Sequence, residues 1–150
     1  MRSSVRSWAR ASDERSHALV PSERRKIYQN MATVKETLPK LTQMDGFIGA
    51  SIVDSGSGMS LGSVGGNGID LEAAAAGNTE VVRAKRKTMR ALDLRDTIED
   101  ILITLGNAYH VIRPLGSNDA LFVYLVLDRS KANLAMARHQ LRLLEKDLVV

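Results

Sequence analysis

The run Leu121–Leu127, LFVYLVL, constrains the fold of this chain more than any other feature of its sequence. It is far shorter than the roughly 20 apolar residues that a membrane-spanning helix needs. A turn signal, Gly116-Ser117-Asn118-Asp119, stands before it. Side chains of a strand point alternately to the two faces of a sheet, so this strand is apolar on both faces. The run therefore predicts a central strand in a sheet that is covered on both sides.

Other strands are expected before this central one. The segment Phe47–Val53 is apolar and β-branched, and Met59–Val64 returns after a Gly-rich turn, which predicts a hairpin. Two further strands, Thr97–Leu105 and Tyr109–Leu115, are separated by the tight-turn signal Gly106-Asn107. In a monomer Thr97–Leu105 would be a long edge strand with apolar side chains on both faces, and such an edge favours pairing with another chain.

Apolar residues at helical spacing predict helices before, between and after these strands. The first runs from Ala32 to Met44 and contains Pro39, which must kink or restart it. The second follows the N-cap Asp70 and continues through Leu92. The third runs from Ser130 or Lys131 to about Leu148. The order αββαβββα predicts one α/β (α+β) domain over residues 31–150, with a five-stranded antiparallel sheet and helices on both faces.

The segment 1–30 has a different character from the rest of the chain. It shows no helical or alternating period and has few large apolar residues, so we expect a disordered basic leader, with Met31 as an alternative start. The leader holds seven basic and three acidic side chains, which accounts for the whole net charge of +4. Residues 31–150 are neutral, which argues against a nucleic-acid-binding domain.

No catalytic, cofactor-binding or metal-binding motif stands out. The chain has no cysteine, which fits a reducing, cytoplasmic setting. The Gly-rich stretch 56–68 has no Lys or Arg for a phosphate-binding loop, and turn glycines explain it better. The histidines lack the spacing of a metal motif, and no G-x-S-x-G elbow occurs. We therefore expect neither an enzyme, nor a cofactor, nor insertion into a membrane.

A cluster of cations on the second helix is the strongest charge feature of the domain. Arg83, Arg86, Lys87 and Arg90 lie three to four residues apart and share a side of the helix. A solvated helix face is the plain interpretation. The sharper one is a docking patch for an acidic protein surface. Nucleic acid or phospholipid is the third alternative, and the lack of stacking aromatic residues nearby disfavours it.

The first turns of the same helix, DLEAAAAG, are rich in small residues. They could pack closely against the helix of a second copy or down onto the chain's own sheet, and the sequence leaves both open. With the apolar edge strand, they favour a homodimer joined by strand or helix. The residues expected at that interface are Leu71, Ala74, Ala75, Ile98 and Leu102.

Four stretches together resemble the Roadblock/dynein light chain domain family, over about residues 32–148. They are MDGFIGASIVDSGSGMSLGS (44–63), DLEAAAAGNTEVV (70–82), DILITLGNAYHVIRPL (100–115) and LFVYLVLDRSKANLAMARHQLRLLE (121–145). The resemblance rests on the order of elements and on these local phrases rather than on one diagnostic motif. The leader lies outside it, and the leader and Pro39 are departures from a minimal member.

The resemblance implies a profilin-like αββαβββα fold and homodimers or heterodimers joined through the middle helix and the third strand. Members of the family associate with small Ras-like GTPases or with dynein and are not hydrolases. In a bacterial member that stimulates a gliding-motility GTPase, the dimer presents its middle helices, which correspond here to about Asp70–Leu92. We therefore expect a dimeric, bacterial-type adaptor of a small GTPase, with modulation of GTP hydrolysis left open. The alternatives are a ligand-sensing domain similar to PAS or GAF sensors and a structural subunit of a larger assembly.

Overall fold

The computed structural model describes residues 21–22, 25 and 33–148. The predicted leader, 1–30, lies almost wholly outside the described residues, and it stays a prediction.

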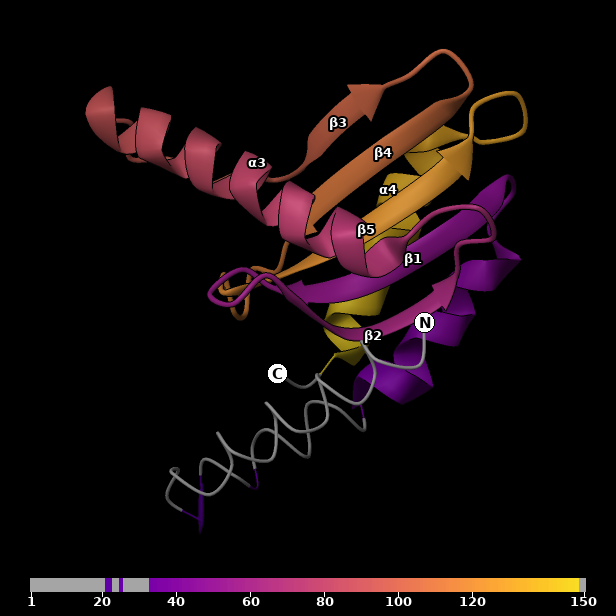
Figure 1. The fold of residues 1–150 in the computed structure, drawn as a ribbon, viewed down its shortest axis with the longest axis horizontal. Helices are drawn as coiled ribbons and strands as arrows, with labels where there is room; N and C mark the ends of the chain where they lie inside the picture. The colour runs from indigo at the N-terminus through magenta and orange to yellow at the C-terminus, as the bar shows by residue number, and fades with distance from the viewer. Residues whose placement is uncertain (1–20, 23–24, 26–32, 149–150) are drawn as a thin grey trace.

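Five strands form one antiparallel sheet in the order β2-β1-β5-β4-β3, so β5 is central and β2 and β3 are the edges (Figure 1). The predicted order of elements is confirmed. The strands span β1 Phe47–Asp54, β2 Met59–Gly65, β3 Ile101–Thr104, β4 Ala108–Pro114 and β5 Leu121–Asp128.

The central strand β5 is buried along its length, as its sequence predicts. Every residue from Leu121 to Leu127 is buried, and the strand pairs with β1 on one side and β4 on the other. Its side chains divide between two cores, one on each face. Val123 and Leu125 lie in the core beneath the last helix, whereas Phe122 and Tyr124 lie in the core beneath the middle helix.

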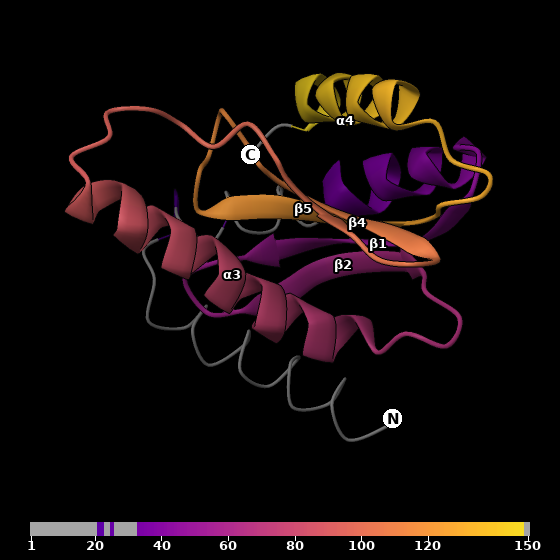
Figure 2. The same cartoon turned by 90° about the horizontal axis from the view of Figure 1, so that it is seen from above.

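The two faces of the sheet are covered by different helices. The middle helix α3, Leu71–Ala91, lies on one face, and the 3₁₀ helix η1, Leu38–Gln43, lies on the other together with α4, Leu134–Asp147 (Figure 2). The α3 face holds the smaller core, which includes Val53, Val82 and Ile112. This three-layer arrangement removes both faces of the central strand from water.

The first helix changes type at the proline. Residues 33–37 are α-helical, and the chain continues directly as the 3₁₀ helix η1 with Pro39 in its first turn. Proline has no N–H and cannot continue the preceding α-helical hydrogen bonds, so the tighter helix begins there. Val34, Leu38 and Leu41 remain buried on both sides of the change.

The helix α3 begins where the sequence predicts. The Asp70 side chain accepts hydrogen bonds from the backbone N–H groups of Glu72 and Ala73, at 3.1 and 3.0 Å, and so satisfies donors that have no partner within the helix. The helix packs on β1 and β2 with its N-terminal half and extends beyond the ends of the strands with its C-terminal half (Figure 1).

The last helix begins later than predicted. The side chain of Asp128 accepts hydrogen bonds from the N–H and the hydroxyl of Ser130, which makes a turn at the end of β5. The side chain of Asn133 then accepts from the N–H of Met136, and α4 starts at Leu134 rather than at Ser130 or Lys131. Ala137, Leu141 and Leu144 of α4 are buried against the sheet, as expected.

Candidate interaction surfaces

The edge strand β3 is shorter than its apolar sequence suggests. It spans Ile101–Thr104, whereas the prediction was Thr97–Leu105. We call residues 92–100 the return segment, because they lead from the tip of α3 back to the sheet (Figure 1). Ile98, a predicted interface residue, lies in this segment and not in β3, so its assignment to the edge strand was wrong. The other strand residue, Leu102, is in β3 and packs partly against the core under α4.

Proline chemistry explains why β3 begins at Ile101. The register pairs Ile101 with Ile112, and its continuation would place Glu99 opposite Pro114. Pro114 has no N–H to donate to a ladder, so pairing stops short of this position. The carbonyl of Glu99 accepts instead from the Nη1 of Arg113, over 3.3 Å. A side chain thus replaces the backbone donor that the strand lacks.

Two arginines hold the end of the return segment from the α4 side. Arg113 is 8% exposed and also donates to Glu145 of α4, over 3.1 Å. Glu145 in turn accepts from the backbone N–H of Gly116. Arg138 of α4 binds both carboxylate oxygens of Asp100, at 2.8 and 3.1 Å. Sequence reasoning missed both pairs, because their members lie more than 30 positions apart and no local pattern links them.

The outer edge of β3 offers backbone groups that have no partner among the described residues. The N–H of Leu105 donates to Ala108 on β4, and consecutive residues of an antiparallel strand direct their N–H groups to opposite sides. The N–H groups of Leu102 and Thr104 therefore point away from β4, to the outside of the sheet. Ile101 and Ile103 direct their side chains to the α3 face, where both are only partly buried.

The four cations predicted to bind a partner have different surroundings. Arg83 donates to the backbone carbonyls of Ser55 and Gly56 in the β1–β2 turn, over 2.7 and 2.8 Å. Arg86 donates to the carbonyl of Asp119 in the β4–β5 loop, over 2.7 Å. Both side chains therefore bind the chain's own loops.

The other two cations stay available. Lys87 and Arg90 are exposed, and neither makes an ion pair or hydrogen bond through its side chain within the part of the chain that the structure describes. They lie near the C-terminal end of α3, where the helix extends beyond the sheet (Figure 1).

The Ala-rich turn packs onto the chain's own sheet at two of its predicted interface positions. Ala75 is fully buried and Leu71 is 8% exposed, and both belong to the core on the α3 face. Neither can meet a second copy without leaving that core. Ala74 is partly buried, whereas Ala73 is exposed on the outer side of the helix.

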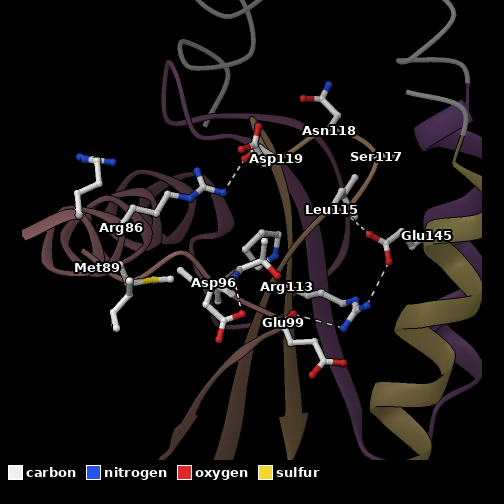
Figure 3. Close-up of a pocket in the computed structure, with 16 residues that line it drawn as sticks. Arg86, Met89, Asp96, Glu99, Arg113, Leu115, Ser117, Asn118, Asp119 and Glu145 are labelled. Atoms are coloured by element: carbon white, nitrogen blue, oxygen red, sulfur yellow. Dashed lines mark hydrogen bonds and ion pairs between the residues drawn. The ribbon is translucent and has the colours of Figure 1, made fainter. Parts of the chain in front are cut away.

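A hollow of about 820 Å³ separates the C-terminal half of α3 from the end of the sheet. Figure 3 shows Arg86 and Met89 of α3 on one side of it and Arg113 and Glu145 on the other. Asp96 of the return segment lies between them (Figure 3). The charged groups that line the hollow are of both signs. Arg86, Arg113 and Glu145 among them already bond to groups of this chain. The hollow thus shows no surplus of one charge that would select an ionic ligand.

A second hollow, of about 510 Å³, lies between α3 and the return segment. Its lining includes the apolar Val81 and Ile101 and the charged Lys85 and Asp100.

Three polar side chains meet on the α3 face. The hydroxyl of Tyr124 lies 3.0 Å from Nδ1 of His110, and the two rings meet edge to face. The side chain of Asn78, on α3, also influences the Tyr124 hydroxyl. Burial lowers the pKa of His110 and raises that of Tyr124. No local pattern could predict this cluster, because the three residues come from three elements.

The described residues contain no group of three or more His, Asp or Glu side chains that could hold a metal ion. None of the helices in this part of the chain is long and apolar enough to cross a membrane.

No family model and no curated protein matches this sequence. Solved structures do match the fold. MglB of Myxococcus xanthus is 15% identical, with 79% of this chain and 86% of that chain covered and a TM-score of 0.69. The gliding protein MglB of Thermus thermophilus is 15% identical, with 79% and 87% covered and a TM-score of 0.65. A Roadblock/LC7 domain from Streptomyces avermitilis is 13% identical, with 74% and 90% covered and a TM-score of 0.64.

These identities are low, but the matches extend over most of each chain. They agree with the profilin-like order of helices and strands and with the resemblance in the sequence. The chain therefore has the Roadblock/LC7 fold.

Proposed function

We propose that this protein is a non-enzymatic, cytoplasmic adaptor that forms a dimer and binds a small Ras-like GTPase. The observation that carries the proposal is the edge strand β3. Its outer N–H groups have no partner in the part of the chain that the structure describes, and it adjoins a part of the α3 face where Ile101 and Ile103 are only partly buried. An edge of this kind is a template for a strand of another chain. The fold shared with MglB proteins supports the same choice of partner class.

The dimer would be isologous, with β3 of one copy beside β3 of the other. Antiparallel pairing of two identical β3 strands gives a dimer with a two-fold axis. The β3 edge of each copy is then paired, so no third copy can add there. A heterodimer with a related Roadblock protein would use the same edge. Of the predicted interface residues, Ala74, Ile98 and Leu102 are the ones that a partner could reach, because Leu71 and Ala75 are buried within the monomer.

The GTPase would bind at α3. Lys87 and Arg90 supply positive charge that no group of the described chain neutralises, and an acidic surface on the GTPase would complement it. Charge complementarity at the rim of an interface mainly raises the association rate and the specificity. Arg83 and Arg86 would contribute less, because their guanidinium groups already hold the β1–β2 and β4–β5 loops.

Two measurements test the proposal. Light scattering at micromolar concentration should give the mass of a dimer. A pull-down with Ras-like GTPases from the same genome, each loaded with GDP or with a GTP analogue, should show binding that depends on the nucleotide. Phosphate release from the GTP-loaded partner, with and without this protein, then measures any effect on hydrolysis. Self-association with no binding to any GTPase would indicate a structural subunit instead.

The hollow beside α3 favours one alternative, a ligand-sensing domain. Its volume of about 820 Å³ lies within the range of small-molecule sites, roughly 300–1,000 Å³. Against this, three of the charged side chains on its wall, Arg86, Arg113 and Glu145, already bond to groups of this chain. A thermal-shift screen with metabolites distinguishes the two functions, because a sensor would be stabilised by a ligand in the absence of any GTPase.

A further inference from the structure

The loop that joins β2 to α3 (Figure 1) contains a tight turn with an asparagine and a glycine at its centre. The N–H of Ile69 donates to the carbonyl of Gly66 over 2.9 Å, which closes residues 66–69 into this turn. Gly68 has a φ of +82°, the sign that the third residue of a type II turn requires. Asn67 and Gly68 are both exposed. The turn therefore presents the pair Asn67-Gly68 to water.

The side-chain amide of an exposed asparagine can react with the main chain that follows it. In this loop the nitrogen of Gly68 would give up its proton and bond to Cγ of Asn67, and the Cγ–Nδ2 bond would break to release ammonia. Water then opens the resulting succinimide ring at either of its carbonyl carbons. Opening at Cγ gives aspartate, and opening at the main-chain carbon gives isoaspartate. Water is the only co-reactant, so the reaction needs no other chain and no cofactor.

Both reacting groups are free in the described part of the chain. The N–H of Gly68 makes no hydrogen bond there, and neither does the side chain of Asn67. A Cβ built on Gly68 would have nothing within 4 Å, so the space around this residue is open. The Gly68 nitrogen must turn toward the Asn67 side chain to react, and glycine permits the wide range of backbone angles that this movement needs.

The other four asparagines among the described residues each lack one of these conditions. Asn78 lies within α3, where the helix holds the N–H that follows it. The side-chain oxygens of Asn118 and Asn133 each accept from a backbone N–H over 3.1 Å. Asn107 is exposed, but the next residue is Ala108, whose Cβ crowds the attacking nitrogen. Within the described chain, Asn67 alone combines exposure, a free amide and a following glycine.

We propose that Asn67 is a site of spontaneous deamidation, and that its isoaspartyl product loosens the start of α3. Isoaspartate adds one carbon to the main chain between Gly66 and Gly68. The hydrogen bond from Ile69 to Gly66 closes the turn across this position, so it cannot keep its geometry when the main chain lengthens. Asp70, which caps α3, follows the turn directly.

The turn has little room to absorb the extra carbon, because Gly66 is held on both sides. Its N–H donates to the carbonyl of Ile48 on β1 over 2.7 Å. Gly66 is also buried against the first residue of α3, since a Cβ built on it would lie 2.7 Å from Cδ1 of Leu71. The displacement therefore passes to the other end of the turn, where the Asp70 cap and the buried Leu71 begin the helix.

Peptide mapping by mass spectrometry, after incubation of the full chain at 37 °C and pH 8, tests the site. The mass of the peptide that holds Asn67 should rise as its amide becomes a carboxylate. We expect this conversion to be at least about tenfold faster than at the other four asparagines, each of which must break a hydrogen bond or move a Cβ. Asn67→Gln is the matched control, because it keeps an amide but places its carbon one bond farther from the Gly68 nitrogen. It should not convert at this position.

Thermal denaturation of the aged protein tests the effect on α3. A methyltransferase that labels isoaspartate measures how much of that product has formed, and the melting temperature should fall as the label rises. Asn67→Asp carries the new charge without the extra main-chain carbon, so its melting temperature should stay near that of the unchanged protein.

The two parts of the proposal fail separately. Conversion at Asn67 no faster than at Asn107 would overturn the site. An isoaspartyl fraction that melts at the same temperature as the unchanged protein would overturn the effect on α3. An equal fall in the melting temperature of Asn67→Asp would overturn it as well, because charge alone would then account for the change.

Discussion

The Nη1 of Arg113 donates to the backbone carbonyl of Glu99 over 3.3 Å, beside the position where Pro114 interrupts the strand ladder. This contact fixes the end of the return segment to β4. It also sets the length of the edge strand, since residues before Ile101 find a side-chain donor instead of a backbone partner. The outer edge of β3, which we assign to dimerisation, therefore depends for its length on the buried Arg113 of the neighbouring strand β4.

Replacement of Arg113 by Leu should destabilise the domain. The change leaves the carboxylate of Glu145, 18% exposed, without its cationic partner, and the Glu99 carbonyl loses its donor. Removal of one member of a buried ion pair costs roughly 3–5 kcal/mol, and we expect the low end because Gly116 still donates to Glu145. Urea denaturation measures the change. Arg142→Leu, at an exposed position of α4, is the control. Equal midpoints for the two variants would contradict the structural role of Arg113.

A larger side chain at Ala75 should also destabilise the domain. Ala75 is fully buried between α3 and the sheet, so Ala75→Leu overpacks the core by roughly 1–3 kcal/mol. Ala73→Leu, on the exposed side of the same helix, should change the free energy of unfolding little. Thermal denaturation of both variants measures the difference. If Ala75→Leu abolished dimerisation while stability stayed unchanged, the small-residue stripe would face a second copy after all.

Proline at Thr104 should weaken a strand-paired dimer more than it weakens the fold. The N–H of Thr104 points to the outer side of β3, so Thr104→Pro removes no hydrogen bond of the β3–β4 ladder. It does remove a donor that a second β3 would need. Light scattering should show a shift toward monomer, whereas Thr104→Val should remain a dimer. Unchanged dimerisation of Thr104→Pro would place the interface elsewhere.

Charge reversal should separate the two pairs of cations on α3. Lys87→Glu with Arg90→Glu should reduce binding to the GTPase and leave the melting temperature nearly unchanged, because both side chains are exposed and lack partners in the described chain. Higher salt should shrink the difference from the unchanged protein. Arg83→Gln with Arg86→Gln should lower the melting temperature instead, because the carbonyls of Ser55 and Asp119 lose their donors. If the Lys87 and Arg90 variant lowered the melting temperature, and the Arg83 and Arg86 variant reduced only GTPase binding, this division of the four cations would be wrong.

Much of the fold could be predicted from local sequence. The apolar run of β5, the N-cap Asp70 and the helix change at Pro39 all act over a few residues, and each lies where its pattern places it. The predictions failed where a distant group competes with the local preference. Thr97 and Ile98 favour a strand, but Pro114 lies opposite Glu99 in the continued register, and Arg113 and Arg138 bind the Glu99 carbonyl and the Asp100 side chain.

The candidate surfaces could be predicted only in part. The sequence correctly placed Arg83, Arg86, Lys87 and Arg90 on one helix, but it could not show which of them bind the chain's own loops. Those contacts join positions 27 to 33 residues apart. It likewise left open whether the small residues of α3 face the sheet, and Ala75 does, together with the larger Leu71.

The sequence by itself determined the order of elements, the central place of β5 and the lack of any recognisable catalytic motif, because these follow from periodicity, capping and residue type. Tertiary structure alone decided where β3 begins, which cations stay available and that His110 meets Tyr124. Each of these depends on which groups from distant parts of the chain come within hydrogen-bonding distance, and no local pattern encodes that distance.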